Sequence, residues 1–76
     1  MSRERRFTVQ LRPEPEGGFT VLVPALPEVV TYGADEDEAM DNAREAIELA
    51  IDVRRDEGEE IPEDVATRIR SLIVAA

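Results

Sequence analysis

The 76-residue sequence contains no cysteine and no histidine. Without cysteine it can form neither a disulfide framework nor a thiolate metal site, and without histidine it lacks imidazole ligands. The same absences exclude the Ser-His and Cys-His pairs that activate a nucleophile. No apolar run has the length of a signal peptide or a membrane span. We therefore expect a cytoplasmic protein without membrane association, cofactor or metal site.

The length of the chain predicts one small domain over residues 1–76. A domain of this size buries only about 60 % of its unfolded surface and is marginally stable alone. We therefore expect a homodimer or a higher oligomer, formed through a sheet edge or the C-terminal segment.

Acidic residues are concentrated in the middle of the chain. Residues 1–34 carry four arginines and four glutamates, residues 35–64 carry fourteen acidic residues and three arginines, and the net charge is −9. Such an acidic surface repels nucleic-acid backbones and attracts a basic protein. A solvated helix face that maintains solubility is the simpler interpretation. Arg3, Arg5 and Arg6 leave a DNA-binding role open, although a frayed terminus explains them more simply.

Residues 34–58 have the pattern of one long amphipathic helix. Asp35 can cap its first turn, Glu38 completes a capping-box pair, and Gly58 can adopt the left-handed conformation that ends a helix. One arc of the helix is apolar, which predicts packing on a sheet. This arc comprises Ala39, Met40, Ala43, Ala46, Ile47, Ala50, Ile51 and Val53. Asn42, at its edge, is placed to hydrogen-bond a loop backbone.

The residues before the helix have the pattern of three short strands. Residues 7–12 and 19–23 alternate apolar and polar side chains, and turn formers between them predict a hairpin. Residues 29–32 form a third, β-branched run. Pro24 and Pro27 make the intervening segment a rigid connection rather than a strand, and Gly33 lets the chain turn into the helix.

Residues 65–76 fit two patterns. Their apolar spacing suits a helix, but residues 67–74 also suit a strand. We favour a fourth strand, which could extend the sheet or pair with another subunit. The predicted fold class is α+β: a three- or four-stranded, mainly antiparallel sheet with one long helix on one face, in the order β-β-β-α-β. The predicted core comprises Phe7, Val9, Leu11, Phe19, Val21, Val23, Leu26, Val30, Ala39, Met40, Ala43, Ile47, Ala50 and Ile51.

Two surfaces are candidates for binding a partner. One is the acidic helix face, with Glu45, Glu48, Asp52 and Asp56. The other is the second face of the sheet, with Thr8, Gln10, Thr20 and Leu22. The sequence does not choose between them.

An enzymatic site is disfavoured. The acidic run of residues 35–38 resembles a metal cluster only along the sequence, because successive residues on a helix point about 100° apart. Helix capping explains the run, and the three predicted strands contain no Asp or Glu with which to build a two-metal site. We therefore expect no catalytic residues.

The ordered pattern of the chain resembles the HicB antitoxin family. The matching residues extend over residues 6–64: Gly17, Gly18, Phe19, Pro24, Leu26, Pro27, Thr31, Gly33, Glu38, Ala39, Asn42, Ala43, Glu45, Ala46, Leu49, Gly58, Ile61 and Pro62. The chain departs from the family at two positions. The family often has an acidic residue in place of Ala25 and glycine in place of Glu28.

The resemblance implies a fold and a partner. The N-terminal domain of the family has an incomplete ribonuclease-H-like fold, and it binds and blocks HicA, a small basic messenger-RNA-cleaving toxin. Full-length members often add a DNA-binding segment. Residues 65–76 are too few for a helix-turn-helix, so no separate DNA-binding domain is expected here. The alternative is a stand-alone HicB-like protein that has an autoregulatory DNA-binding role or has lost its toxin partner.

Overall fold

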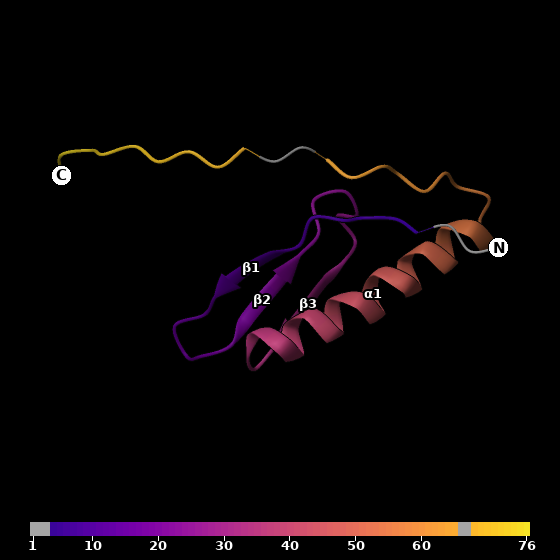
Figure 1. Ribbon diagram of the computed structural model, residues 1–76, viewed down its shortest axis with the longest axis horizontal. Helices are drawn as coiled ribbons and strands as arrows, with labels where there is room; N and C mark the ends of the chain where they lie inside the picture. The colour runs from indigo at the N-terminus through magenta and orange to yellow at the C-terminus, as the bar shows by residue number, and fades with distance from the viewer. Residues whose placement is uncertain (1–3, 66–67) are drawn as a thin grey trace.

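The computed structural model describes residues 4–65 and 68–76. Its elements are β1 (Gln10–Pro13), β2 (Phe19–Leu22), β3 (Val30–Gly33) and α1 (Glu36–Asp56). The strands form one antiparallel sheet in the order β1-β2-β3, and α1 lies across one face, over β3 and β2 (Figure 1). The predicted α+β fold, with three antiparallel strands and one long helix, is confirmed.

A glycine-rich turn joins β1 to β2. Glu14 N–H donates to the Gly18 carbonyl and Gly17 N–H to the Glu14 carbonyl, each at 3.0 Å. Gly17 and Gly18 have φ values of 104° and 77°, which only glycine adopts readily. Strand β1 begins three residues later than predicted. Extending its register would set Thr8 opposite Pro24, which has no N–H to donate.

Two consecutive β-turns connect β2 to β3 and share Leu26. Leu26 N–H donates to the Val23 carbonyl, and Val29 N–H donates to the Leu26 carbonyl, each at 2.9 Å. Pro24 and Pro27 occupy the second position of each turn, where the fixed φ of proline is favourable. Because the turns hold it from both sides, the Leu26 side chain points inward and is completely buried.

Local signals define both ends of α1. Asp35 is the N-cap, and its Oδ1 accepts from Glu38 N–H at 2.8 Å, while the Glu38 carboxylate accepts from Ala34 N–H. At the other end, Gly58 N–H donates to the Arg55 carbonyl and Glu59 N–H to the Arg54 carbonyl. With Gly58 at a φ of 72°, this pair of bonds is a Schellman motif.

The core lies between α1 and the sheet in two adjoining clusters. One contains Val23, Leu26, Val29 and Ala50, and the other contains Val21, Ala39 and Ala43. Small residues allow α1 to approach closely at its first turn. A Cβ built on Gly33 would lie 2.2 Å from Ala39 N, so only glycine fits there.

Two predicted core residues are wrong. Val30 is 62 % exposed and Met40 46 % exposed. In β3 the residues that face α1 are the odd-numbered ones, so Val29 is buried in place of Val30. Met40 lies on the flank of α1 that faces away from β3, and Ala25 is a buried residue that the sequence pattern did not identify.

The predicted fourth strand does not form within residues 68–76 of this single chain, and neither does a helix. Thr67, the first residue of that prediction, lies outside the described residues. The segment extends past the sheet (Figure 1), and its large apolar side chains, Ile69, Leu72, Ile73 and Val74, are exposed. Without a strand or a second subunit beside it, this segment has no backbone partners from which to form a ladder.

Candidate partner-binding surfaces

The outer side of α1 presents the acidic helix face. Glu45, Glu48, Asp52 and Asp56 are all exposed, because they lie on the side of the helix opposite the buried alanines. Successive members are three or four residues apart, so their carboxylates follow one stripe along the helix. This surface therefore offers closely spaced negative charge.

The face of the sheet away from α1 is the open sheet face. Its cross-strand rows are Gln10–Leu22–Val30 and Arg12–Thr20–Tyr32. The Thr20 hydroxyl donates to Glu14 Oε1 at 2.6 Å, and this bond, followed by the one from Arg12, lowers the pKa of Glu14. Three of the four sheet residues that the sequence singled out therefore lie together, although the Thr20 hydroxyl is already engaged.

Thr8, the fourth of these residues, is held by a different contact. Its N–H donates to Asp64 Oδ1 at 2.8 Å and its hydroxyl to Asp64 Oδ2 at 2.7 Å. The backbone bond, followed by the hydroxyl bond, lowers the pKa of Asp64. This contact ties the segment after α1 to the segment before β1, so Thr8 contributes to the fold.

The acidic helix face and the open sheet face lie on opposite sides of the molecule. Helix α1 covers one face of the sheet (Figure 1). Its exposed acidic residues lie on the side opposite the alanines that it buries against the sheet. A compact partner of similar size cannot cover both surfaces at once without wrapping around the domain.

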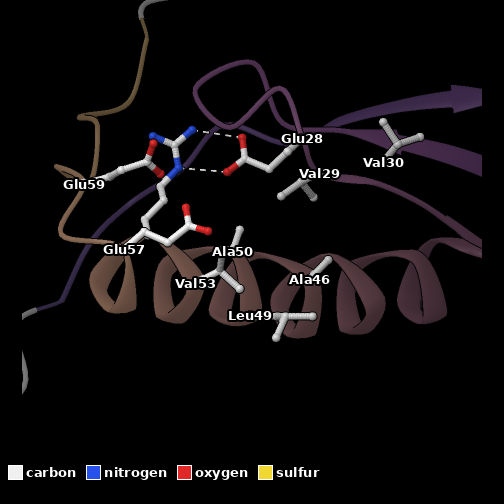
Figure 2. Close-up of a pocket in the computed structure, with 10 residues that line it drawn as sticks. Glu28, Val29, Val30, Ala46, Leu49, Ala50, Val53, Glu57 and Glu59 are labelled. Carbon is white, nitrogen blue, oxygen red and sulfur yellow. Dashed lines mark hydrogen bonds and ion pairs between the residues drawn. The ribbon is translucent and has the colours of Figure 1, made fainter.

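A third surface lies between the helix and the start of β3. We call it the β3–α1 notch, a volume of about 480 Å³ lined by Glu28, Val29, Val30, Ala46, Leu49, Ala50, Val53, Arg54, Glu57 and Glu59. Figure 2 shows Ala46, Ala50 and Val53 of α1 near Val29 and Val30 at the start of β3, with charged side chains gathered at one end. Leu49 and Val53 are 65 % and 46 % exposed. The notch is therefore a mainly apolar surface that is open to solvent.

An ion pair closes one end of the notch. Arg54 Nε lies 2.8 Å from Glu28 Oε2, and its second guanidinium nitrogen Nη2 lies 2.9 Å from Oε1, so the pair is bidentate (Figure 2). The hydrogen bond from Arg54 is the main cause that lowers the pKa of Glu28, and the bond to Glu28 raises that of Arg54. Glu28, one of the two departures from the family pattern, thus binds the last turn of α1, and Ala25, the other, is buried.

The acidic run of residues 35–38 is occupied by helix capping. Asp35 and Glu38 both accept backbone N–H groups, as described above. Within residues 4–65 and 68–76, no three acidic side chains are grouped so that they could share a metal ion. No helix in that part of the chain is long and apolar enough to cross a membrane. Arg5 and Arg6 are exposed, whereas Arg3 lies outside the described residues.

Sequence reasoning missed the β3–α1 notch. The available signal was the spacing of Ala46, Leu49 and Val53, which places three apolar residues on one flank of α1. It was also necessary to know that the odd-numbered residues of β3 face α1. If the even-numbered residues are taken to face it, Val30 falls in the core instead of at the rim of the notch.

Comparison with known proteins gives a consistent result. A family model described as the HicB_like antitoxin of bacterial toxin-antitoxin system matches residues 7–75. Antitoxin HicB of Escherichia coli K12 is 40 % identical over 57 residues, which are 75 % of this chain and 41 % of the relative. Antitoxin HicB 1 of Photorhabdus laumondii is 35 % identical over 60 residues, covering 79 % and 39 % respectively. The chain thus spans about two fifths of the HicB antitoxins that it matches.

A shorter relative is matched over almost its whole length. UPF0150 protein Ta0767 of Thermoplasma acidophilum is 38 % identical over 64 residues, which are 84 % of this chain and 93 % of the relative. The family model covers all three strands and α1. The chain therefore belongs to the HicB-like antitoxin family.

Proposed function

We propose that this chain is the toxin-binding module of a toxin–antitoxin system and that it neutralises a small, basic, HicA-type messenger-RNA-cleaving toxin. Membership of the HicB-like antitoxin family is the observation that carries the proposal. The charge of the chain supports a basic partner, since residues 35–64 hold fourteen acidic residues against three arginines. Charge complementarity of this kind speeds encounter and selects among partners.

The chain acts in this proposal by covering the toxin and has no chemistry of its own. Asp35, Arg54 and Thr8, whose polar contacts are among those described above, serve helix capping, ion pairing and the tie to Asp64. A toxin that cleaves messenger RNA works in the cytoplasm, and we place its inhibitor there.

The test is co-expression with the basic protein encoded by the neighbouring gene. We expect the chain to restore growth that the toxin arrests. The purified pair should bind more weakly as salt rises from about 50 mM to about 500 mM, because the Debye length falls from roughly 14 Å to 4 Å. The absence of a basic neighbour, or binding that ignores salt, contradicts the proposal. A variant with Glu45, Glu48, Asp52 and Asp56 changed to their amides should bind with a smaller association rate and a flatter salt dependence.

We also propose that the chain forms a homodimer or a higher oligomer through a sheet edge or the C-terminal segment. The exposed apolar side chains of residues 68–76 support this, because a second subunit would remove them from water. The outer edge of β1 is a suitable neighbour, since the Thr8–Asp64 contact brings the chain to that edge. Light scattering across a concentration series measures the oligomeric state directly.

A further inference from the structure

The β3–α1 notch exposes apolar side chains that the fold itself does not require. Leu49 and Val53 belong to neither of the two core clusters, yet they are among the most apolar residues of α1. Together with Ala46 and Ala50 they form a floor beside the start of β3 (Figure 2). A patch of this kind with charged residues at its margin is typical of a protein-binding surface.

The margin of the notch is acidic. Glu57 and Glu59 line it, and Arg54 is the one cation among its lining residues, already paired with Glu28. Glu45 lies one helical turn before Leu49 and therefore adjoins the floor from the side of the acidic helix face. The notch thus combines an apolar floor with a net negative margin that is continuous with the acidic helix face.

The charge distinguishes between the possible occupants. In a symmetric dimer built on the notch, each acidic margin would face its own copy, and like charges oppose such contact. Addition of a complete strand to β3 is also impeded, because Asn42 Nδ2 already donates to the Tyr32 carbonyl at 2.7 Å. A basic protein that inserts an apolar side chain and surrounds it with Lys or Arg meets neither obstacle.

We propose that the β3–α1 notch is where this chain holds its basic partner, with an apolar side chain of the partner seated on Leu49 and Val53. This inference rests on the proposed function and deepens it by naming the contact surface. The acidic helix face then attracts the basic partner during the encounter, and the notch provides the apolar contact from which water is excluded. The open sheet face, on the other side of the molecule, takes no part.

The experiment compares Leu49→Arg with Met40→Arg. Both residues are exposed apolar residues of α1, but Met40 lies on the opposite flank, outside the notch. Each variant is titrated with an inactivated form of the neighbouring gene's basic protein, after urea unfolding has shown that it folds. We expect Leu49→Arg to raise the Kd by about 30-fold or more, as for a central anchor site, and Met40→Arg to change it by less than about 3-fold.

The outcomes separate the inference from the proposed function. If the unaltered chain does not bind the basic protein at all, the proposed function fails and the inference fails with it. If the unaltered chain binds and Leu49→Arg binds equally well, or loses no more affinity than Met40→Arg, the inference alone is overturned. A dimer of the free chain that Leu49→Arg dissociates would show that a second copy occupies the notch, which also overturns it. Val53→Arg provides a second variant on the same floor.

Discussion

Leu26 is predicted to contribute more to stability than any other single side chain of the connecting segments. It is completely buried against Val23, Val29 and Ala50. Two hydrogen-bonded turns, each with a proline, hold its backbone from both sides. The loop cannot easily collapse into the space that Leu26→Ala would leave, so the loss should lie in the middle of the range for such changes, about 3–4 kcal/mol.

That loss is large for a domain of this size. Stability of about 0.05–0.15 kcal/mol per residue gives roughly 4–11 kcal/mol for the whole chain. With about 4–8 °C per kcal/mol for domains of this length, Leu26→Ala should lower the Tm by roughly 12–32 °C. Urea unfolding followed by circular dichroism measures the free energy directly, and the m-value should not change.

Val30→Ala is the matched control. Both residues are apolar and lie near the start of β3, but Val30 is 62 % exposed. Its truncation should cost less than about 1 kcal/mol, the span of strand propensities. If Leu26→Ala lowered the free energy of unfolding no more than Val30→Ala does, the paired turns would not hold Leu26 as a buried anchor for α1.

Three further predictions concern other parts of the chain. Gly33→Ala should lower the free energy of unfolding in urea by about 3 kcal/mol or more, because the new Cβ collides with backbone atoms of Ala39. Gly17→Ala should lower it by about 1–2 kcal/mol, because Gly17 has a φ of 104° but no neighbour within 4 Å of the new Cβ. A larger loss for Gly17→Ala than for Gly33→Ala would contradict the packing argument. The pKa of Asp64 should lie below its ordinary value of 3.8 in an NMR titration and rise in part in Thr8→Val, which keeps the backbone donor. The stabilisation from this contact is therefore present above pH 3.8 and is lost as the pH falls through the lower folded-state pKa. Deletion of residues 68–76 should leave the urea midpoint of the domain unchanged at low concentration but reduce any oligomer to monomer in light scattering; an unchanged oligomer would exclude this segment as the interface.

The sequence predicted those features of the fold that local chemistry controls. The helix limits follow from an acidic cap pattern and a glycine stop, and the hairpin follows from alternation interrupted by Pro and Gly. The core of β2 was also predictable, because residues 19–23 alternate cleanly. In each case one short stretch of sequence contained the whole signal.

The features that failed depend on contacts between distant segments. Residues 29–32 alone do not show which side chains of β3 face α1, because Val29 and Val30 are equally apolar. Only the register with β2 decides that Val29 is buried and Val30 is exposed. Residues 68–76 need a neighbouring strand before their sequence pattern can produce a strand. The Arg54–Glu28 ion pair joins residues that are 26 positions apart, and no local sequence pattern predicts it.

The candidate binding surface was predictable only in its charge. The count of acidic residues indicated a basic partner, but the β3–α1 notch forms where α1 and the start of β3 lie beside each other and leave Leu49 uncovered. Apolar residues on the flank of a helix look the same in sequence whether a strand covers them or not.

The bond between Thr8 and Asp64 has a practical consequence for anyone who attaches a label or a fusion partner. It directs the chain beyond α1 toward the β1 margin of the sheet, whereas the notch opens beside β3 at the far margin. If the notch holds the basic partner as proposed, a fluorophore or an affinity handle joined after Ala76 should leave that contact undisturbed, while the same group introduced in the turns around Pro27 would obstruct it.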